Sequence, residues 1–260
     1  MKIKYIIRFI LLAILISLIG FLIYSNVGID YNYYSLYDND FGIKICHISD
    51  YHNKKLDSKL VDKIKSENVD FIAITGDLID SGKGGNALEF ITNIKDIAPI
   101  YYVTGNHEAD DMNFLPSFLL ELEILGVNIL QNKSVYFTKN NKNIKIIGVD
   151  DPLISDSALF LNSLETDDEF KVLLTHRPER IDQYVNCNID LVLSGHAHGG
   201  LFNLPFVGGL YAPNQGFFPK YYEGIYKEQN TTMVVSKGVG NSSVIPFRFL
   251  NKAEVIFISI

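Results

Sequence analysis

Residues 43–52 read Ile-Lys-Ile-Cys-His-Ile-Ser-Asp-Tyr-His, a β-branched run of strand length that ends in Asp50 and His52. The same unit recurs along the chain as an apolar run, a polar turn and often an amphipathic helix. The expected strands are 43–49, 69–75, 100–104, 144–149, 172–175, 191–194, 233–236 and 255–260, and the expected helices are 56–67, 87–97, 114–125, 156–164 and 180–185. This alternation predicts an α/β domain whose strands are buried between layers.

The N-terminal segment differs in composition from the rest of the chain. No charged residue occurs between Phe9 and Ile29, and a helix of roughly 20 apolar residues spans a hydrocarbon layer about 30 Å thick. A cleaved signal peptide is the alternative, but no small-x-small cleavage site follows the apolar run. We therefore predict a transmembrane anchor at residues 1–24, a tether at 25–40 that includes an edge strand near Tyr31–Tyr37, and one domain at 41–260.

Charges around this segment predict its orientation. Lys2, Lys4 and Arg8 precede the apolar run, and the first charges after it are acidic. The positive-inside rule then places the N-terminus in the cytoplasm and the domain outside, as in a single-pass protein of the cell membrane. The formal net charge of -7 argues against a nucleic-acid partner, because such affinity comes largely from Lys and Arg.

The cysteine content excludes two kinds of site. Cys46 and Cys187 are the only cysteines, too few for a disulfide framework or a thiolate zinc site. We expect both thiols to be buried, although a single bridge between them remains open.

Metal-capable side chains follow several of the expected strands, where the loops of α/β sheets present ligands. These turn residues are Asp50 and His52, then Asp77, then Asn106, His107 and Glu108, then His176, and finally His196 and His198. Each of them alone is more often a turn residue or a surface histidine than a ligand. Five of the six histidines fall in these turns, and it is this joint occurrence that predicts a metal centre.

The donor chemistry narrows the choice of ion. Mixed oxygen and imidazole donors suit manganese, iron, zinc, cobalt or nickel, whereas the absence of thiolate argues against a closed structural zinc site. The candidate ligands also exceed one coordination shell that keeps a position open for water. We therefore expect two ions that share a bridging carboxylate, about 3.5–4 Å apart.

The ordered motifs Asp-x-His, Gly-Asp, Gly-Asn-His-Glu, a lone His and Gly-His-x-His, from Asp50 to His198, resemble those of the calcineurin-like metallophosphoesterases. The tail at 236–242 and Pro246-Phe247-Arg248 resembles that of the bacterial membrane-anchored branch, which usually has leucine at Tyr51, threonine at Ala197 and arginine at Lys237. None of these departures removes a ligand. The resemblance implies a four-layer α/β/β/α sandwich of two mixed sheets.

The resemblance also implies a role for each candidate residue. One divalent ion is held by Asp50, His52 and His198, a second by Asn106, His176 and His196, and both by Asp77. His107 is the catalytic residue, placed beside the leaving-group oxygen. The ions are expected to be manganese, iron or zinc.

These roles predict a phosphoester hydrolase in which a two-metal-activated hydroxide attacks a phosphomonoester or phosphodiester in line. A lipid-linked or cell-envelope phosphate ester is one candidate substrate, since the anchor holds the site near the membrane. The alternatives are a metal-binding scaffold without catalysis and a nuclease of the same superfamily.

Three features near the predicted site have more than one interpretation. Glu108 either accepts a hydrogen bond that orients His107 or a ligand, or is a surface carboxylate, and Arg177 either contacts substrate or lies on the surface. The apolar residues of loop 201–218 are expected mainly in the core, and the alternatives are an apolar wall beside the metals or insertion into the membrane interface. His47 is expected to be structural.

Overall fold

The computed structural model describes residues 2–80, 82–164, 169–241 and 246–260. Ser242, in the tail motif, lies outside the described residues. Twelve strands form two six-stranded mixed sheets. The first sheet has the order β1 (Asp30–Ser35), β16 (Glu254–Ser259), β2 (Lys44–Ile48), β3 (Phe71–Thr75), β4 (Ile100–Val103) and β5 (Asn128–Ile129). The second has the order β14 (Gly224–Glu228), β15 (Thr231–Val235), β9 (Leu191–Ser194), β8 (Phe170–Leu174), β7 (Lys142–Gly148) and β6 (Lys133–Lys139).

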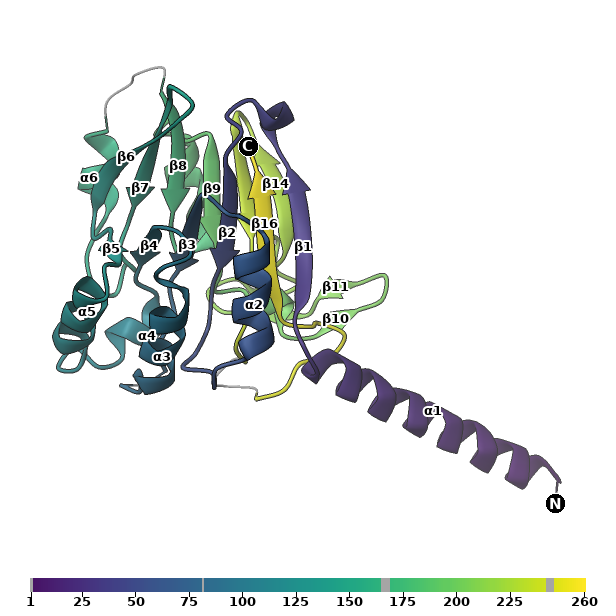
Figure 1. Cartoon of the computed structure of the whole chain (residues 1–260). Helices are drawn as coiled ribbons and strands as arrows, with labels where there is room; N and C mark the ends of the chain where they lie inside the picture. The colour runs from purple at the N-terminus through teal and green to yellow at the C-terminus, as the bar shows by residue number, and fades with distance from the viewer. Residues whose placement is uncertain (1, 81, 165–168, 242–245) are drawn as a thin grey trace.

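The sheets pack face to face between two helical layers (Figure 1). The helices are α1 (Lys2–Asn26), α2 (Ser58–Ser66), α3 (Gly85–Ile94), α4 (Asn106–Ala109), α5 (Leu115–Ile124), α6 (Ala158–Asn162) and α7 (Ile181–Val185). Helices α2, α3 and α5 cover the first sheet, and α6 and α7 cover the second. This is the predicted four-layer α/β/β/α sandwich.

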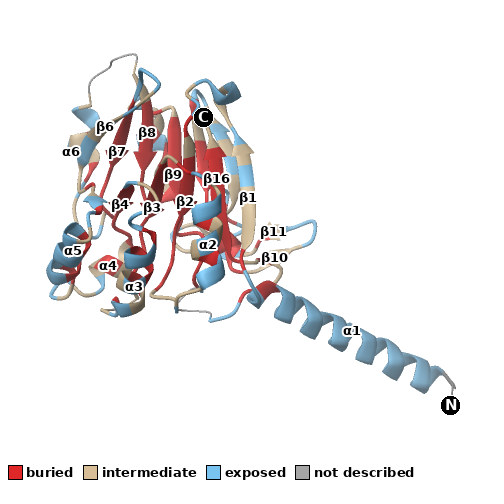
Figure 2. Ribbon diagram, in the orientation of Figure 1, coloured by how far each residue is buried: buried red, intermediate tan, exposed pale blue. Residues whose placement is uncertain are grey.

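Alternation of side chains along buried strands assigns each residue to one of three cores. In β2, Ile45 faces the other sheet, whereas Cys46 and Ile48 pack under α2 and α3. Strands that are covered on both faces read as continuous apolar runs, which is why the sequence shows no polar alternation there. Figure 2 shows these strands as buried in both sheets.

The expected strands and helices are all present, but the sequence analysis missed several strands. Strands β14 and β6 form the two opposite edges of the second sheet, and both alternate largely between exposed and half-buried positions. Four two-residue strands form small hairpins in loop 201–218, namely β10 (Asn203–Leu204), β11 (Gly208–Gly209), β12 (Tyr211–Ala212) and β13 (Gly216–Phe217). Such short or edge pairings carry little hydrophobic periodicity.

Helix α1 is long and apolar enough to cross a membrane, with 24 residues from Ile3 to Asn26 and a mean hydropathy of 2.9 in its best window. The segment expected to be a tether is shorter than predicted. Residues 30–35 form β1, which pairs with β16 in parallel, so only residues 27–29 connect it to α1. The expected edge strand is therefore present, and it replaces most of the tether.

The side chains of loop 201–218 divide between core and surface. Leu201 is buried as expected, whereas Phe206, Val207, Phe217 and Phe218 are more than half exposed. The prediction that these residues lie mainly in the core is wrong for the latter four. Cys46 is buried and Cys187 is half-buried, and both are free thiols.

Candidate metal centre

The carboxyl ends of strands from both sheets lie together at one edge of the sandwich. From the first sheet, Asp50 follows β2, Asp77 follows β3, and Asn106 begins α4 after β4. From the second sheet, His176 follows β8, and His196 and His198 follow β9. The structure thus gathers the predicted ligands, which lie far apart in the sequence. We call these side chains together with His52 the metal centre.

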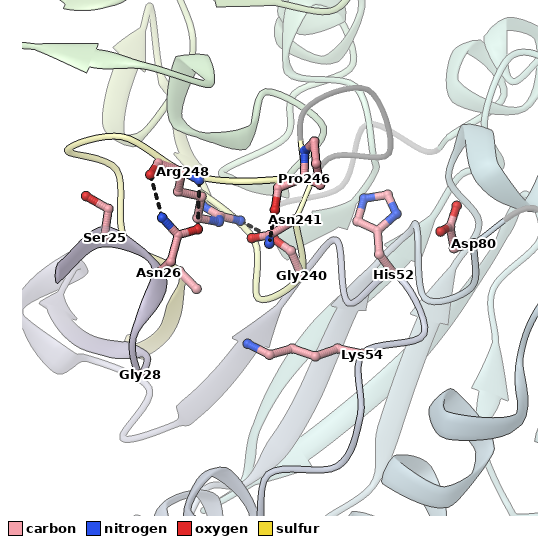
Figure 3. A pocket seen from close by; sticks show the side chains of 11 residues that line it. Ser25, Asn26, Gly28, His52, Lys54, Asp80, Gly240, Asn241, Pro246 and Arg248 are labelled. Atoms are coloured by element: carbon pink, nitrogen blue, oxygen red, sulfur yellow. Dashed lines mark hydrogen bonds between the residues drawn. The ribbon is translucent and has the colours of Figure 1, made fainter. Parts of the chain in front are cut away.

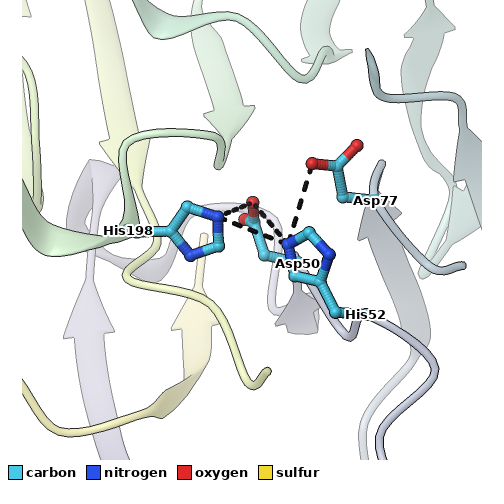
Figure 4. A group of neighbouring side chains, drawn as sticks. All are labelled: Asp50, His52, Asp77 and His198. Atoms are coloured by element: carbon cyan, nitrogen blue, oxygen red, sulfur yellow. Dashed lines mark hydrogen bonds and ion pairs between the residues drawn. The ribbon is translucent and has the colours of Figure 1, made fainter. Parts of the chain in front are cut away.

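One group of donors consists of Asp50, His52, Asp77 and His198, whose ligand atoms all lie within 4.8 Å of one another (Figure 4). The two imidazoles face each other, with 3.3 Å between their Nε2 atoms. His198 Nε2 lies 3.4 Å from Asp50 Oδ1, and His52 Nε2 lies 3.8 Å from Asp77 Oδ2. Nitrogen and oxygen atoms converging in this way fit a divalent cation.

A second group consists of Asp77, His176 and His196. His176 Nε2 lies 3.2 Å from Asp77 Oδ2, 3.2 Å from Asn106 Oδ1 and 3.1 Å from His196 Nδ1. Asp77 is therefore common to both groups, which is the position that a bridging carboxylate requires.

The protonation of the histidines fits a metal site. Burial lowers the pKa of His52 and, more strongly, of His198, so both rings are neutral and present lone pairs. Burial also opposes a charge on His176, but the Asp77 carboxylate outweighs it and raises the pKa of His176 to about 10. Asp77 and His176 would hold a cation only with this proton removed, because metal ligands must be deprotonated.

The ligand loops have an unusual backbone. Asp50, His52, Asp77, His196 and His198 have positive φ angles of 50°, 50°, 50°, 65° and 47°. Non-glycine residues rarely adopt this conformation, and such strain collects at functional sites, where the surroundings hold it at a cost of about 1–3 kcal/mol each. Close packing is part of that support, since a Cβ at Gly105 would overlap the Asp77 carboxylate.

Glu108 holds the loop that carries Asp77. It is fully buried, and its carboxylate accepts hydrogen bonds from the N–H groups of Asp77, Leu78, Ile79 and Gly105 at 2.6–3.2 Å. Burial and the charge of Asp77 raise the pKa of Glu108 to about 7, against the pull of these N–H donors. Glu108 is thus not a surface carboxylate. Its hydrogen bonds hold the backbone of the loop that carries Asp77, a candidate ligand.

Replacing Glu108 by glutamine should therefore destabilise the fold. The amide would turn an NH2 group toward buried N–H donors and leave some of them unpaired, a loss of about 2–3 kcal/mol. Thermal unfolding of the metal-free protein measures this loss, and Glu89→Gln, at an exposed position on α3, is the matched control. Equal melting temperatures for the two variants would contradict the supporting role.

His107 lies at the rim of the metal centre. Its Nε2 lies 4.0 Å from Asp77 Oδ2, and its Nδ1 lies 3.2 Å from Asp110 Oδ2 and 3.5 Å from Asp80 Oδ1. The ring packs edge-on against His52, with centroids 4.7 Å apart. The carboxylates thus orient one ring nitrogen and leave the other directed at the centre. His52, Asp80 and His107 form a further group of metal-capable side chains.

Arg177 differs from both interpretations that the sequence allowed. It is buried and makes a bidentate ion pair with Asp151, with bonds of 2.5 Å from Nε and 3.0 Å from Nη2. Its Nη1 donates to Asn214 Oδ1 at 2.5 Å, and the same oxygen lies 2.8 Å from His196 Nε2. Arg177 Nη1 itself lies 2.8 Å from His196 Nε2. His196 Nε2 therefore either donates to the Asn214 oxygen or accepts from the Arg177 guanidinium, depending on the tautomer of the ring. In both cases Arg177 and Asn214 hold the ring of a candidate ligand.

Asp151 and Asn214 were missed by the sequence analysis. Asp151 follows the expected strand 144–149, so its place at a strand end was a usable signal. Asn214 lies in an irregular loop between β12 and β13 and gave none. His47 has the structural role that was expected, since it is buried with its Nε2 2.9 Å from Thr75 Oγ1.

The structure is a four-layer sandwich with Asp, Asn and His donors at the carboxyl ends of its strands, an arrangement that fits a metal-dependent hydrolase. Residues 43–200 match the family model of the calcineurin-like phosphoesterases. The chain belongs to that family.

Two of the three relatives described here carry the word metallophosphoesterase in their names. The chain is 30% identical over 225 residues to YpbG of Bacillus subtilis, an uncharacterized protein, and covers 81% of it. It is 29% identical over 241 residues to a putative metallophosphoesterase of Caenorhabditis elegans, with 85% of this chain and 49% of the relative covered. A transmembrane protein with metallophosphoesterase domain from Danio rerio is 29% identical over 82% of this chain and 52% of its own length. The chain thus spans about half the length of the last two relatives.

Solved structures share the fold at low identity. The NAD nucleotidase NadN of Haemophilus influenzae aligns with a TM-score of 0.50 and 17% identity over 75% of this chain and 45% of its own. The phosphopantetheinyl hydrolase PptH of Mycobacterium tuberculosis aligns with a TM-score of 0.50 and 11% identity over 74% of this chain and 88% of its own. At these identities the likeness concerns the fold alone.

Proposed function

We propose that this chain hydrolyses phosphate esters with two divalent cations, manganese, iron or zinc, bound at the metal centre. The observation that carries the proposal is the place of Asp77, whose carboxylate belongs to both donor groups. A single structural ion needs no shared carboxylate and no histidine at the rim, whereas a two-ion hydrolase uses both.

In this proposal each side chain has one task. Asp50, His52 and His198 hold one ion, Asn106, His176 and His196 hold the other, and Asp77 joins them. When bound, the two ions supply a water-derived nucleophile at neutral pH and neutralise the phosphate oxygens. His107 donates a proton from Nε2 to the departing oxygen, with Asp110 and Asp80 orienting its ring.

A generic aryl phosphate tests the proposal directly. The protein stripped with a chelator should be inactive toward 4-nitrophenyl phosphate and bis(4-nitrophenyl) phosphate. Adding manganese should restore hydrolysis of one or both esters, with saturation at two ions per chain. Stoichiometric metal binding without turnover of either ester would favour the metal-binding scaffold instead.

The proposed location is the cell membrane, with α1 as a single span and the domain outside the cytoplasm. The apolar length of α1 and the cations Lys2, Lys4 and Arg8 before it support this orientation. A lipid-linked or envelope phosphate ester is then the proposed substrate, because anchoring raises its effective concentration at the site. The acidic net charge gives no support to a nuclease.

Protease accessibility checks the orientation. When protease is added to intact cells that express the full chain with a tag at each end, the C-terminal tag should be digested and the N-terminal tag retained. Detergent should make both tags accessible. A C-terminal tag that survives in intact cells and is lost only after permeabilisation would reverse the orientation.

A further inference from the structure

The C-terminal end of α1 is fixed to the domain beside the metal centre. Asn26 exchanges two hydrogen bonds with the backbone of Arg248, since its Nδ2 donates to the carbonyl at 2.7 Å and its Oδ1 accepts from the N–H at 2.9 Å (Figure 3). The N–H of Leu250 donates to Ser25 Oγ at 2.7 Å. The last turn of the apolar helix is thus attached to the segment that follows the tail motif.

A cavity of about 410 Å³ lies between this helix end and the metal centre. Asn26 lines it on the helix side and His52 on the side of the metal centre, with Lys54, Asn241 and Arg248 between them (Figure 3). Asp80 also lines it. Because the apolar run of α1 ends at Tyr24, the cavity begins at the level where the proposed span meets water.

Two cations in this cavity are hydrogen-bonded only to uncharged groups within the described part of the chain. Arg248 is buried, and its Nη2 donates to backbone carbonyls of Lys237, Gly238 and Gly240. Its Nε and Nη1 have no hydrogen-bond partner among the described residues. Lys54 Nζ donates to the carbonyl of Val239 at 3.0 Å.

Arg248 has no ion pair with a carboxylate among the described residues, although the more distant charges of Asp50 and Glu254 favour its charged form. A buried guanidinium without a directly bound anion is costly. Burial lowers the pKa of Arg248 to about 10, so the group remains charged at neutral pH. Guanidinium and ammonium groups are the usual partners of phosphate oxygens. The cavity therefore has the charge and the donors to receive an anionic phosphate group beside His52.

An apolar groove of about 430 Å³ runs along the last turns of α1. It is lined by Ser17, Gly20, Phe21, Tyr24 and Leu250. Nothing lies within 4 Å of the position that a Cβ on Gly20 would take, so the groove is open there. Leu250 lines the groove, and Ser25, which accepts a hydrogen bond from the Leu250 N–H, lines the cavity.

The β10–β11 hairpin, near the end of α1, carries exposed apolar residues. Figure 1 shows the β10–β11 hairpin beside the end of α1, and its turn carries the exposed Phe206 and Val207. Phe202, which precedes the hairpin, packs against Phe247 with ring centroids 5.9 Å apart. The hairpin is thus packed, through Phe202, against the segment that is hydrogen-bonded to α1. Exposed apolar side chains beside a membrane span are typical of a surface that contacts lipid.

We propose that the substrate is a membrane lipid with a phosphate ester head group, whose acyl chain lies in the groove beside Gly20 and whose phosphate passes Lys54 and Arg248 to reach the metal centre. This inference rests on the proposed hydrolase function and specifies its substrate class. It also gives the attachment of α1 a purpose, because the hydrogen bonds of Ser25 and Asn26 hold the groove and the cavity at a fixed separation.

Two phosphodiesters that share a leaving group test the groove. They are 4-nitrophenyl hexadecyl phosphate and 4-nitrophenyl ethyl phosphate, offered to the full-length protein in lipid nanodiscs with manganese. Gly20→Leu should lower kcat/KM for the hexadecyl ester about tenfold, because leucine occupies the space of the chain. It should leave the ethyl ester unchanged.

Ala13→Leu is the matched control, since it lies two turns earlier in α1 and outside the groove. It should leave both esters unchanged, which separates the groove from simple partitioning of the long chain into the bilayer. Equal effects of Gly20→Leu on the two esters would overturn the proposal that the acyl chain lies in the groove. Failure of the wild-type protein to cleave the ethyl ester would instead count against the hydrolase function itself.

Lys54→Gln tests the head-group cavity without disturbing the backbone bonds of Arg248. It should lower kcat/KM for the hexadecyl ester about tenfold, the effect of losing one charge-assisted hydrogen bond. Lys59→Gln, at an exposed position on α2, should have no effect. Equal activity of Lys54→Gln and wild-type protein would remove Lys54 from the proposed path.

Photolabelling gives a readout that does not need turnover. Phosphatidic acid with a diazirine in its acyl chain should label the peptides that contain Phe21 and Leu250 in nanodiscs, with or without metal. Gly20→Leu should reduce this labelling several-fold, and Ala13→Leu should not. Labelling spread evenly along α1, or unchanged in Gly20→Leu, would contradict the proposal even in an active enzyme.

Discussion

Replacing Asp77 by asparagine should abolish hydrolysis and metal binding together. The carboxylate belongs to both donor groups, and its loss removes a negative charge from two coordination shells at once. We expect activity to fall by at least about 10³-fold, which corresponds to several kcal/mol of lost stabilisation. Elemental analysis after gel filtration should show fewer than two ions per chain, in parallel with the lost rate.

The control for this prediction is Asp96→Asn. The Asp96 side chain is 89% exposed and also carries one negative charge, so it reproduces the change in net charge without touching the centre. It should keep metal content and rate. An Asp77→Asn protein that retains two ions and near-normal turnover would remove the bridging assignment.

The position of the metal centre was predictable because strand ends can be located from sequence. Apolar runs such as 69–75 end sharply, and Asp77 stands directly after the turn glycine. Once the sheets are parallel at their centre, these ends must meet at one edge. The number of candidate ligands predicted two ions with a shared carboxylate, and the family resemblance alone gave the two donor groups and the role of Asp77.

The supports of the ligands were not predictable in the same way. Glu108 was recognised as a neighbour of the site, but its four backbone contacts depend on how the turn after β3 folds back on α4. The positive φ angles of Asp50 and His198 are likewise imposed by tertiary packing. Local propensity disfavours them, so only the assembled fold reveals them.

The attachment of α1 shows a different limit. Polar, tyrosine-rich composition at 25–40 predicted a tether with an edge strand, and residues 30–35 do form that strand, but its partner β16 was not predicted. Strand β16 lies at the opposite end of the chain, and no local sequence pattern predicts which strand β1 pairs with. The polar composition agrees with the partial exposure of β1 but does not predict its hydrogen bonds to β16.

Replacing His107 by alanine should lower the rate and leave both ions bound. The imidazole lies at the rim with Nε2 4.0 Å from Asp77 Oδ2, and its proposed task is to protonate the departing oxygen. Loss of such a proton donor typically costs about 10²–10⁴-fold. The loss should be largest for alkyl phosphates, whose leaving groups need the proton, and smallest for 4-nitrophenyl phosphate, whose leaving group does not.

Metal content and leaving-group dependence together separate this role from the alternatives. If His107 were a ligand of a third ion with His52 and Asp80, its removal would lower metal content, and added manganese would partly restore the rate. If it only shaped the rim, alkyl and aryl esters would lose rate equally. Two retained ions with a loss that grows with the pKa of the leaving group would agree with proton donation alone, because neither other role depends on that pKa.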